Sequence, residues 1–253
     1  MMKKKPLAEL LLKLPEIPAQ KRKKVTVVTG MHRSGTSCIT GMLVECGLNT
    51  GPATTLLNHN TSQKSNLKGH FENYNMVVIN DRILNNARGS WKNPPPSDLI
   101  EAEGNKIGNH VNYFSKTFSG NIVKDPRLCL TLDIWKKWWN NIDNVIAVLR
   151  NPLSVAMSLN KRDGISIKDG LELWYTYNSR LAYHYITIVD YDKLLHEAGN
   201  IMHKLISIIG METNIDTKFF DGRLNHNMVD ENEILRLYPI VKDLYFNMKS
   251  RAI

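Results

Sequence analysis

Two glycines, an arginine and three hydroxyl side chains fall within eight residues near the start of the chain. They form the segment Gly30-Met31-His32-Arg33-Ser34-Gly35-Thr36-Ser37, between a β-branched run and a helical pattern. Such a turn lets backbone N–H groups converge beside the positive end of a helix. The spacing is that of a Walker A loop, but Thr36 stands where nucleotide hydrolases carry lysine. We therefore expect a phosphate-binding loop whose charge comes from Arg33; an ordinary glycine-containing turn is the alternative.

A second group of polar residues follows a later strand. Arg150 ends that strand, Pro152 suits the first turn of a helix, and Ser158 lies eight residues after the arginine. Since a helical turn takes about 3.6 residues, Ser158 falls roughly two turns into the helix. Arg150 and Ser158 can then meet around one anion, although a proline-started helix after arginine is also common without any ligand.

Together the two segments resemble the sulfotransferases that use 3′-phosphoadenosine 5′-phosphosulfate (PAPS). The resemblance runs from about Val25 to Leu195, is strongest to bacterial-type members and includes features of the tyrosylprotein branch. It implies that Arg150 and Ser158 hold the 3′-phosphate of the donor, that PAP is the product, and that no metal takes part. It also implies a set of residues around the 5′-phosphosulfate, namely His32, Arg33, Ser34, Gly35, Thr36 and Ser37.

Three further positions fit this resemblance. Lys124, in Lys-Asp-Pro-Arg, is similar to a lysine that stabilises the sulfuryl group, and Tyr191 to a tyrosine on the adenine side. Glu72 matches the region of the catalytic base, with His70 as the alternative base. The resemblance thus implies that Glu72 takes the acceptor proton while Arg33 and Lys124 stabilise developing charge.

Each of these positions also has a plain structural interpretation. In these interpretations Lys124 and Asp125 would form a surface ion pair, and Tyr191 would pack at a strand end. Glu72 would be a favourable charge near a helix N-terminus. Weaker candidates for the site are Arg162 and two residues of a late loop, Arg223 and His226. The cluster of Trp135, Trp138 and Trp139 is most simply a packed helix face.

The elements that must position these residues alternate along the chain. The expected strands are Val25–Thr29, 121–123, Val145–Leu149 and Ile186–Val189. The expected helices are 35–47, 74–87, 97–118, 128–139, 152–160, 171–185, 191–209 and 231–249, with loops at 49–70 and 213–228. This order predicts an α/β fold, a P-loop-like parallel sheet flanked by helices, as a single domain over residues 25–253.

Composition narrows the class of protein. The chain has 253 residues, 42% of them apolar, three cysteines without metal-ligand spacing, and no apolar run long enough to span a membrane. These features favour a cytoplasmic enzyme. Residues 1–24 carry eight basic and two acidic residues of a chain whose net charge is +9, so the body is only mildly basic and a nucleic-acid partner is disfavoured. The arm 1–24 is expected to be solvated, or to make weak contact with a membrane surface.

The predicted activity is transfer of a sulfuryl group from PAPS to a hydroxyl acceptor. A glycan or another small molecule is favoured over a protein as the acceptor. Two alternatives remain open: a nucleotide-dependent kinase or hydrolase on the same fold, which would need the absent Walker lysine, and a polyanion-binding protein that uses residues 1–24.

Overall fold

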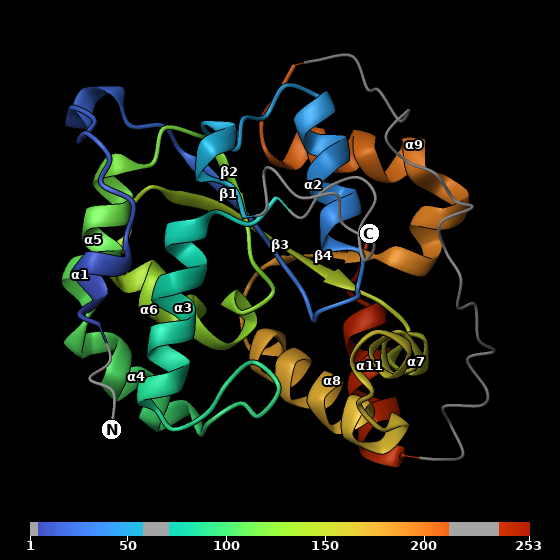
Figure 1. Ribbon diagram of the computed structural model, residues 1–253. Helices are drawn as coiled ribbons and strands as arrows, with labels where there is room; N and C mark the ends of the chain where they lie inside the picture. The colour runs from blue at the N-terminus through green and yellow to red at the C-terminus, as the bar shows by residue number, and fades with distance from the viewer. Residues whose placement is uncertain (1–4, 58–70, 213–237) are drawn as a thin grey trace.

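Four short strands form one parallel sheet in the order β2-β1-β3-β4. The strands are β1 (Val25–Thr29), β2 (Ile122–Lys124), β3 (Ile142–Leu149) and β4 (Thr187–Asp190). In this computed structural model, which describes residues 5–57, 71–212 and 238–253, helices lie on both faces of the sheet (Figure 1). Burial from both sides explains why the strands are continuous β-branched and apolar runs. The predicted α/β class and single domain are confirmed.

Two apolar clusters fill the space between the sheet and its helices. Val28 and Ile146 face one cluster, with α2 (Thr36–Glu45) and α9 (Tyr191–Ile208) packed over them (Figure 1). Val27 and Ala147, one residue along in each strand, face the other cluster. That larger cluster includes residues of α3 (Tyr74–Asn86), α4 (Ser97–Lys106), α5 (Gly108–Thr117), α6 (Leu128–Trp138), α7 (Pro152–Asp163), α8 (Ile167–Ala182) and α11 (Pro239–Lys249).

The helices differ from the expected pattern chiefly at two places. The single helix expected over 97–118 is two helices that meet at Ile107. There α5 approaches α6 so closely that a Cβ on Gly108 would lie 2.1 Å from the ring of Trp138. The helix expected from Leu171 begins earlier, at Ile167. The expected loop 213–228, and residues 231–237 of the last expected helix, lie outside the described residues.

Part of the segment 5–24 is attached to the domain, although most of its side chains are exposed, as expected of a solvated arm. The short helix α1 (Leu7–Leu10) buries Leu7, and Leu11 is buried beside it in the larger apolar cluster. The Leu12 N–H donates to Asn75 Oδ1 at 2.7 Å, and Asn75 Nδ2 donates back to the Leu12 carbonyl at 3.1 Å. Farther along, the N–H of Leu14 donates to the hydroxyl of Tyr113. Paired backbone groups and buried leucines thus fix this segment across α3 and α5.

Two short 3₁₀ turns complete the described fold, one at Ala19–Lys21 and one at Ala53–Thr55. The second leads to a backbone bridge between Leu56 and Asn73, just before α3. None of the helices in the described ranges is both long enough and apolar enough to cross a bilayer.

Candidate active site

The predicted site residues gather where the strands end. Gly30 follows β1, Lys124 closes β2, Arg150 follows β3, and Tyr191 follows β4. Because all four strands are parallel, these residues lie at one edge of the sheet. The chain leaves β1 toward β2 on one side and later returns to β3 on the other side. In open α/β sheets, ligands bind outside the carboxyl ends at such a reversal.

The loop after β1 adopts a strained backbone. Gly30 has a φ of 141°, and a Cβ there would lie 2.5 Å from the carbonyl oxygen of Val148. Gly35, the N-cap of α2, has a φ of 92°, and Arg33 has a φ of 72° although it is not glycine. Left-handed backbone at a non-glycine residue costs about 1–3 kcal/mol and is concentrated at functional sites. The Ser34 hydroxyl is buried without a hydrogen-bond partner within the described ranges, which suits an oxygen of a bound ligand.

Arg33, Arg150, Ser158 and Tyr191 meet at one end of the site, which we call the donor end. Arg33 Nε donates to Ser158 Oγ at 2.9 Å, and Arg150 Nη1 donates to the Arg33 carbonyl at 2.9 Å. The Arg150 guanidinium lies 5.0 Å from the centre of the Tyr191 ring. That ring packs on Gly35, where a Cβ would lie 2.2 Å away. The two segments singled out from the sequence are therefore in direct contact.

Arg150 is held by the start of α7. Asn151 caps that helix by accepting from two of its backbone N–H groups, and Pro152 occupies its first turn. The Asn151 N–H donates to Asp192 Oδ2 at 2.8 Å, which joins the turn after β3 to the start of α9. Trp174 Nε1 donates to the Arg150 carbonyl at 3.1 Å. These contacts fix the backbone from which the guanidinium projects.

The donor end concentrates positive charge. The pKa of Arg33 is lowered, first by burial and then by the charges of Arg162 and Arg150. Burial likewise lowers the pKa of Arg150, partly offset by Tyr191 and Asp192. Two guanidinium groups whose charged forms burial disfavours would both be stabilised by a bound anion.

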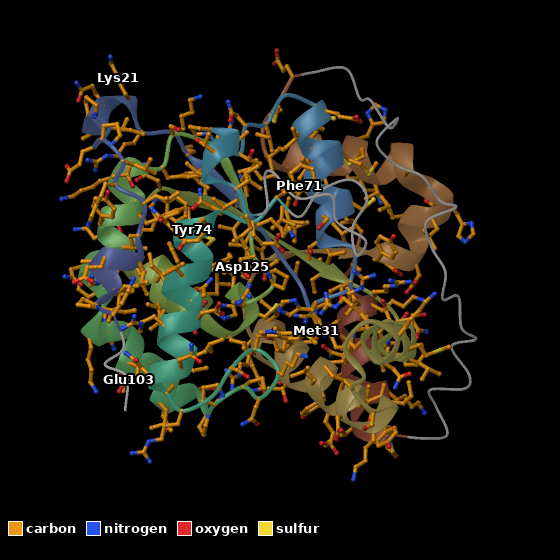
Figure 2. All side chains as sticks on the ribbon, in the orientation of Figure 1. Lys21, Met31, Phe71, Tyr74, Glu103 and Asp125 are labelled. Carbon is orange, nitrogen blue, oxygen red and sulfur yellow. The ribbon has the colours of Figure 1, made fainter. Side chains whose placement is uncertain are left out.

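Glu72 and Lys124 form the other end of the site, which we call the transfer end. Lys124 Nζ lies 2.5 Å from Glu72 Oε1, and the two side chains are only 1% and 10% exposed. Glu72 immediately precedes Asn73, which caps α3. The backbone carbonyl of Glu72 accepts a hydrogen bond from the Leu57 N–H at 2.8 Å. Figure 2 labels Phe71 just before Glu72, and Asp125 just after Lys124, in the middle of the molecule. Burial raises the pKa of Glu72, and the charge of Lys124 opposes that rise.

A buried polar network holds the turn that carries Lys124. Asp125 accepts from Asn80 Nδ2 at 2.9 Å and from Arg127 Nη1 at 3.1 Å, while Arg127 Nε lies 2.7 Å from Asp81. Burial lowers the pKa of Arg127, but Asp125 and Asp81 raise it more, and the net shift is upward. The interpretation of Lys124 and Asp125 as a surface ion pair is therefore wrong. Both are buried, and each has a different partner.

His32 contacts Trp91, which the sequence analysis did not single out as a site residue. Its ring centre lies 4.3 Å from that of Trp91 and 5.9 Å from that of Tyr177. Its pKa is lowered well below the usual range, first by burial and then by the charges of four cations that include Arg162 and Lys124. Neutral imidazole and indole thus stand beside the transfer end. Trp91 lies in a loop without periodicity, and only its large aromatic side chain before the prolines marked it.

Other predicted residues have simpler places. Thr36 is buried in the first turn of α2, and Ser37 beside it is half-buried. Arg162 Nε lies 2.6 Å from Asp163 and its guanidinium 5.6 Å from the Trp91 ring centre, near the site. The predictions for His70, Arg223 and His226 lie outside the described residues. Trp135 and Trp139 are buried as expected of a packed helix face, whereas Trp138 is 36% exposed. Within the described ranges, no cluster of His, Cys, Asp or Glu is placed to hold a metal ion.

Comparison with known proteins gives structural likenesses only. No family model and no curated protein matches the chain. A sulfotransferase domain from the Synechococcus PCC 7002 olefin synthase is similar at 15% identity and a TM-score of 0.48, over 96% of this chain and 93% of that one. Sulfotransferase STF9 from Mycobacterium avium is similar at 14% identity and a TM-score of 0.49, over 83% and 69%. A sulfotransferase domain from the curacin biosynthetic pathway is similar at 15% identity and 0.45, over 91% and 92%.

Proposed function

We propose that this protein transfers a sulfuryl group from PAPS to a hydroxyl acceptor. The observation that carries the proposal is the direct contact of the loop after β1 with Arg150 and Ser158, beside a buried pair of Glu72 and Lys124. A donor with two anionic groups matches a site that has two separate groups of cations. The sequence resemblance assigns Arg150 to the 3′-phosphate, and Arg33 and Lys124 to the phosphosulfate.

The donor would bind along the strand ends. Ser34 supplies a buried hydroxyl, and the start of α2 supplies backbone N–H groups for the 5′-phosphosulfate. Arg150 and Ser158 would hold the 3′-phosphate, and Tyr191 would contact the adenine side. Arg33 donates to Ser158 in this structure, so its guanidinium lies between the groups assigned to the two anions.

The chemical step needs a base at the attacking oxygen and positive charge at the leaving oxygen. In an in-line transfer these two oxygens lie on opposite sides of the sulfur. The acceptor oxygen attacks the sulfur while its proton moves to Glu72, and the bond from sulfur to the bridging oxygen breaks. The electron pair of that bond leaves on the 5′-phosphate of PAP. Lys124 and Arg33 stabilise the charge that develops on the sulfuryl and bridging oxygens. In-line transfer of this kind depends mainly on positioning and electrostatics, as phosphoryl transfer does.

The acceptor would lie beside Glu72, with His32 and Trp91 as neighbouring groups. A glycan or another small molecule is the acceptor class that we propose. Radiolabelled PAPS, incubated with the protein and a panel of saccharides, phenols and peptides, tests the activity directly. Label transfer to one class supports the proposal. Magnesium-dependent ATP turnover without sulfuryl transfer to any acceptor would overturn it in favour of a nucleotide-dependent kinase or hydrolase.

A further inference from the structure

The ammonium group of Lys124 and the carboxylate of Glu72 occupy each other in the structure. Their 2.5 Å contact is buried, so little water competes with it. Charged groups facing the pair come from several elements: Asp125 from the turn after β2, and Arg127 and Asp81 from the neighbouring network. His32 faces Lys124 from the loop after β1 and is held neutral. A new charge that binds beside Lys124 must therefore perturb this ion pair.

In the proposed reaction Glu72 must accept a proton and Lys124 must stabilise a sulfuryl oxygen, and neither can do so while they are paired. A carboxylate oxygen that accepts from an ammonium group is a poor acceptor for the proton of a hydroxyl. The ammonium group can stabilise a sulfuryl oxygen only if it approaches that oxygen. A bound phosphosulfate brings negative charge to the same low-dielectric region and competes directly with Glu72 for Lys124.

We propose that the phosphosulfate of the donor draws Lys124 away from Glu72, so that Glu72 becomes a proton acceptor only when a sulfuryl group is in place. This inference rests on the proposed function. After transfer, the product PAP has no sulfuryl group, and Lys124 returns to Glu72. The returning positive charge expels the proton that Glu72 took from the acceptor, and the proton leaves to solvent. The cycle balances, because one proton enters from the acceptor and one leaves.

Electrostatics make the exchange measurable without an acceptor. Burial and Asp125 raise the pKa of Glu72, and Lys124 is the strongest influence that opposes them. If Lys124 moves to the donor, the pKa of Glu72 rises further and Glu72 takes up a fraction of a proton from solvent. PAP leaves the pair intact and causes no such uptake by Glu72.

Isothermal titration calorimetry in two buffers of different ionisation enthalpy measures that proton. The phosphate monoesters of the ligands have a second pKa of about 6 and can themselves exchange protons on binding. Each ligand is therefore compared with itself between protein variants. We expect PAPS to cause greater proton uptake in the unmodified protein than in Glu72→Gln, and PAP to cause equal uptake in both. The matched control is Asp81→Asn, which removes a carboxylate of the neighbouring network and should keep the PAPS-specific uptake.

Lys124→Met tests the same exchange from the other side. It should also lose the PAPS-specific uptake, because Glu72 then has no ammonium group to release. Circular dichroism of each variant shows that it is folded. Equal uptake of protons with PAPS in the unmodified protein and in Glu72→Gln, while PAPS and PAP both bind, would overturn the exchange and leave the proposed function standing. If neither ligand binds the unmodified protein, the proposed function itself fails.

Discussion

The cationic side chains of the donor end and of the transfer end differ in the partners that they contact. At the donor end, the contacts of Arg33 and Arg150 described above are with neutral groups: a hydroxyl, a carbonyl oxygen and an aromatic ring. At the transfer end, Lys124 contacts Glu72, and Arg127 nearby contacts Asp125. The described contacts therefore hold the guanidinium groups of one end on neutral groups, and the cations of the other end on carboxylates.

The difference separates affinity from chemistry. Buried guanidinium groups next to one another attract an anion before any reaction begins, whereas an ion pair contributes little until something displaces one of its members. Substitutions at the donor end should consequently change ligand affinity, and substitutions at the transfer end should change turnover or stability. Four experiments test that division, in order of expected effect.

The largest effect is expected at Glu72. Glu72→Gln keeps the shape of the side chain and its contact with Lys124 but removes its basicity. Loss of a general base lowers turnover by about 10²–10⁴-fold. Steady-state rates with PAPS and an acceptor from the screen measure it, and PAP affinity should stay nearly unchanged. A fully active Glu72→Gln beside an inactive His70→Ala would move the role of base to His70.

Removing Lys124 should reduce stability. Lys124→Met leaves a buried carboxylate without its ion-pair partner, and breaking a buried pair costs about 3–5 kcal/mol. The pKa of Glu72, already raised by burial, rises further in the folded variant. A carboxyl whose pKa is higher in the folded state binds more protons when folded, so stability falls as pH rises from the unfolded pKa through the folded one.

Urea unfolding at several pH values checks this result. Lys124→Met should be much less stable than the unmodified protein at pH 7 and should recover as the pH falls. The double variant with Glu72→Gln should regain most of the loss. Lys92→Met is the control, because Lys92 lies 3.6 Å from Asp163 with its side chain 47% exposed, and an exposed pair contributes about 0–1 kcal/mol. A pH-independent loss in Lys124→Met would contradict the assignment to Glu72.

Arg150→Ala should weaken ligand binding without involving the base. A hydrogen bond to a charged group contributes about 1.5–3 kcal/mol, which corresponds to roughly a 10- to 150-fold loss of PAP affinity. Calorimetry with PAP and with adenosine 5′-phosphosulfate, which lacks the 3′-phosphate, separates the two anions. Equal losses for both ligands would show that Arg150 does not read the 3′-phosphate.

The smallest effect is expected at Ser158. Its hydroxyl is neutral and contributes about 0.5–1.5 kcal/mol, so Ser158→Ala should lower PAP affinity by roughly 2- to 12-fold. Calorimetry beside Arg150→Ala gives the comparison under one set of conditions. A loss as large as that of Arg150→Ala would mean that the hydroxyl acts mainly by orienting Arg33, to which it is bonded.

The sequence predicted which residues follow the strands, because that information is local. Strands that are covered on both faces read as β-branched runs, and the residues that follow them, Gly30, Arg150 and Tyr191, reach one edge by topology alone. The transfer end was predicted as two separate residues. Their contact joins positions 52 residues apart and depends on where the start of α3 lies relative to the end of β2, which no spacing encodes.

The misjudged elements have the same cause. At the break between α4 and α5, the ring of Trp138 from another helix lies against Gly108. Trp91 reaches His32 because Tyr177 donates to its carbonyl oxygen at 2.9 Å, across 86 residues. Each is a tertiary contact whose partner the local sequence does not name.

The segment 5–24 has a consequence for how the chain folds. Its bonds from Leu12 to Asn75 and from Leu14 to Tyr113 span 63 and 99 residues. Contacts of such separation close long loops, and the entropy of closure opposes them until the rest of the structure is in place. Residues 5–24 therefore cannot dock until α3 and α5 have been synthesised.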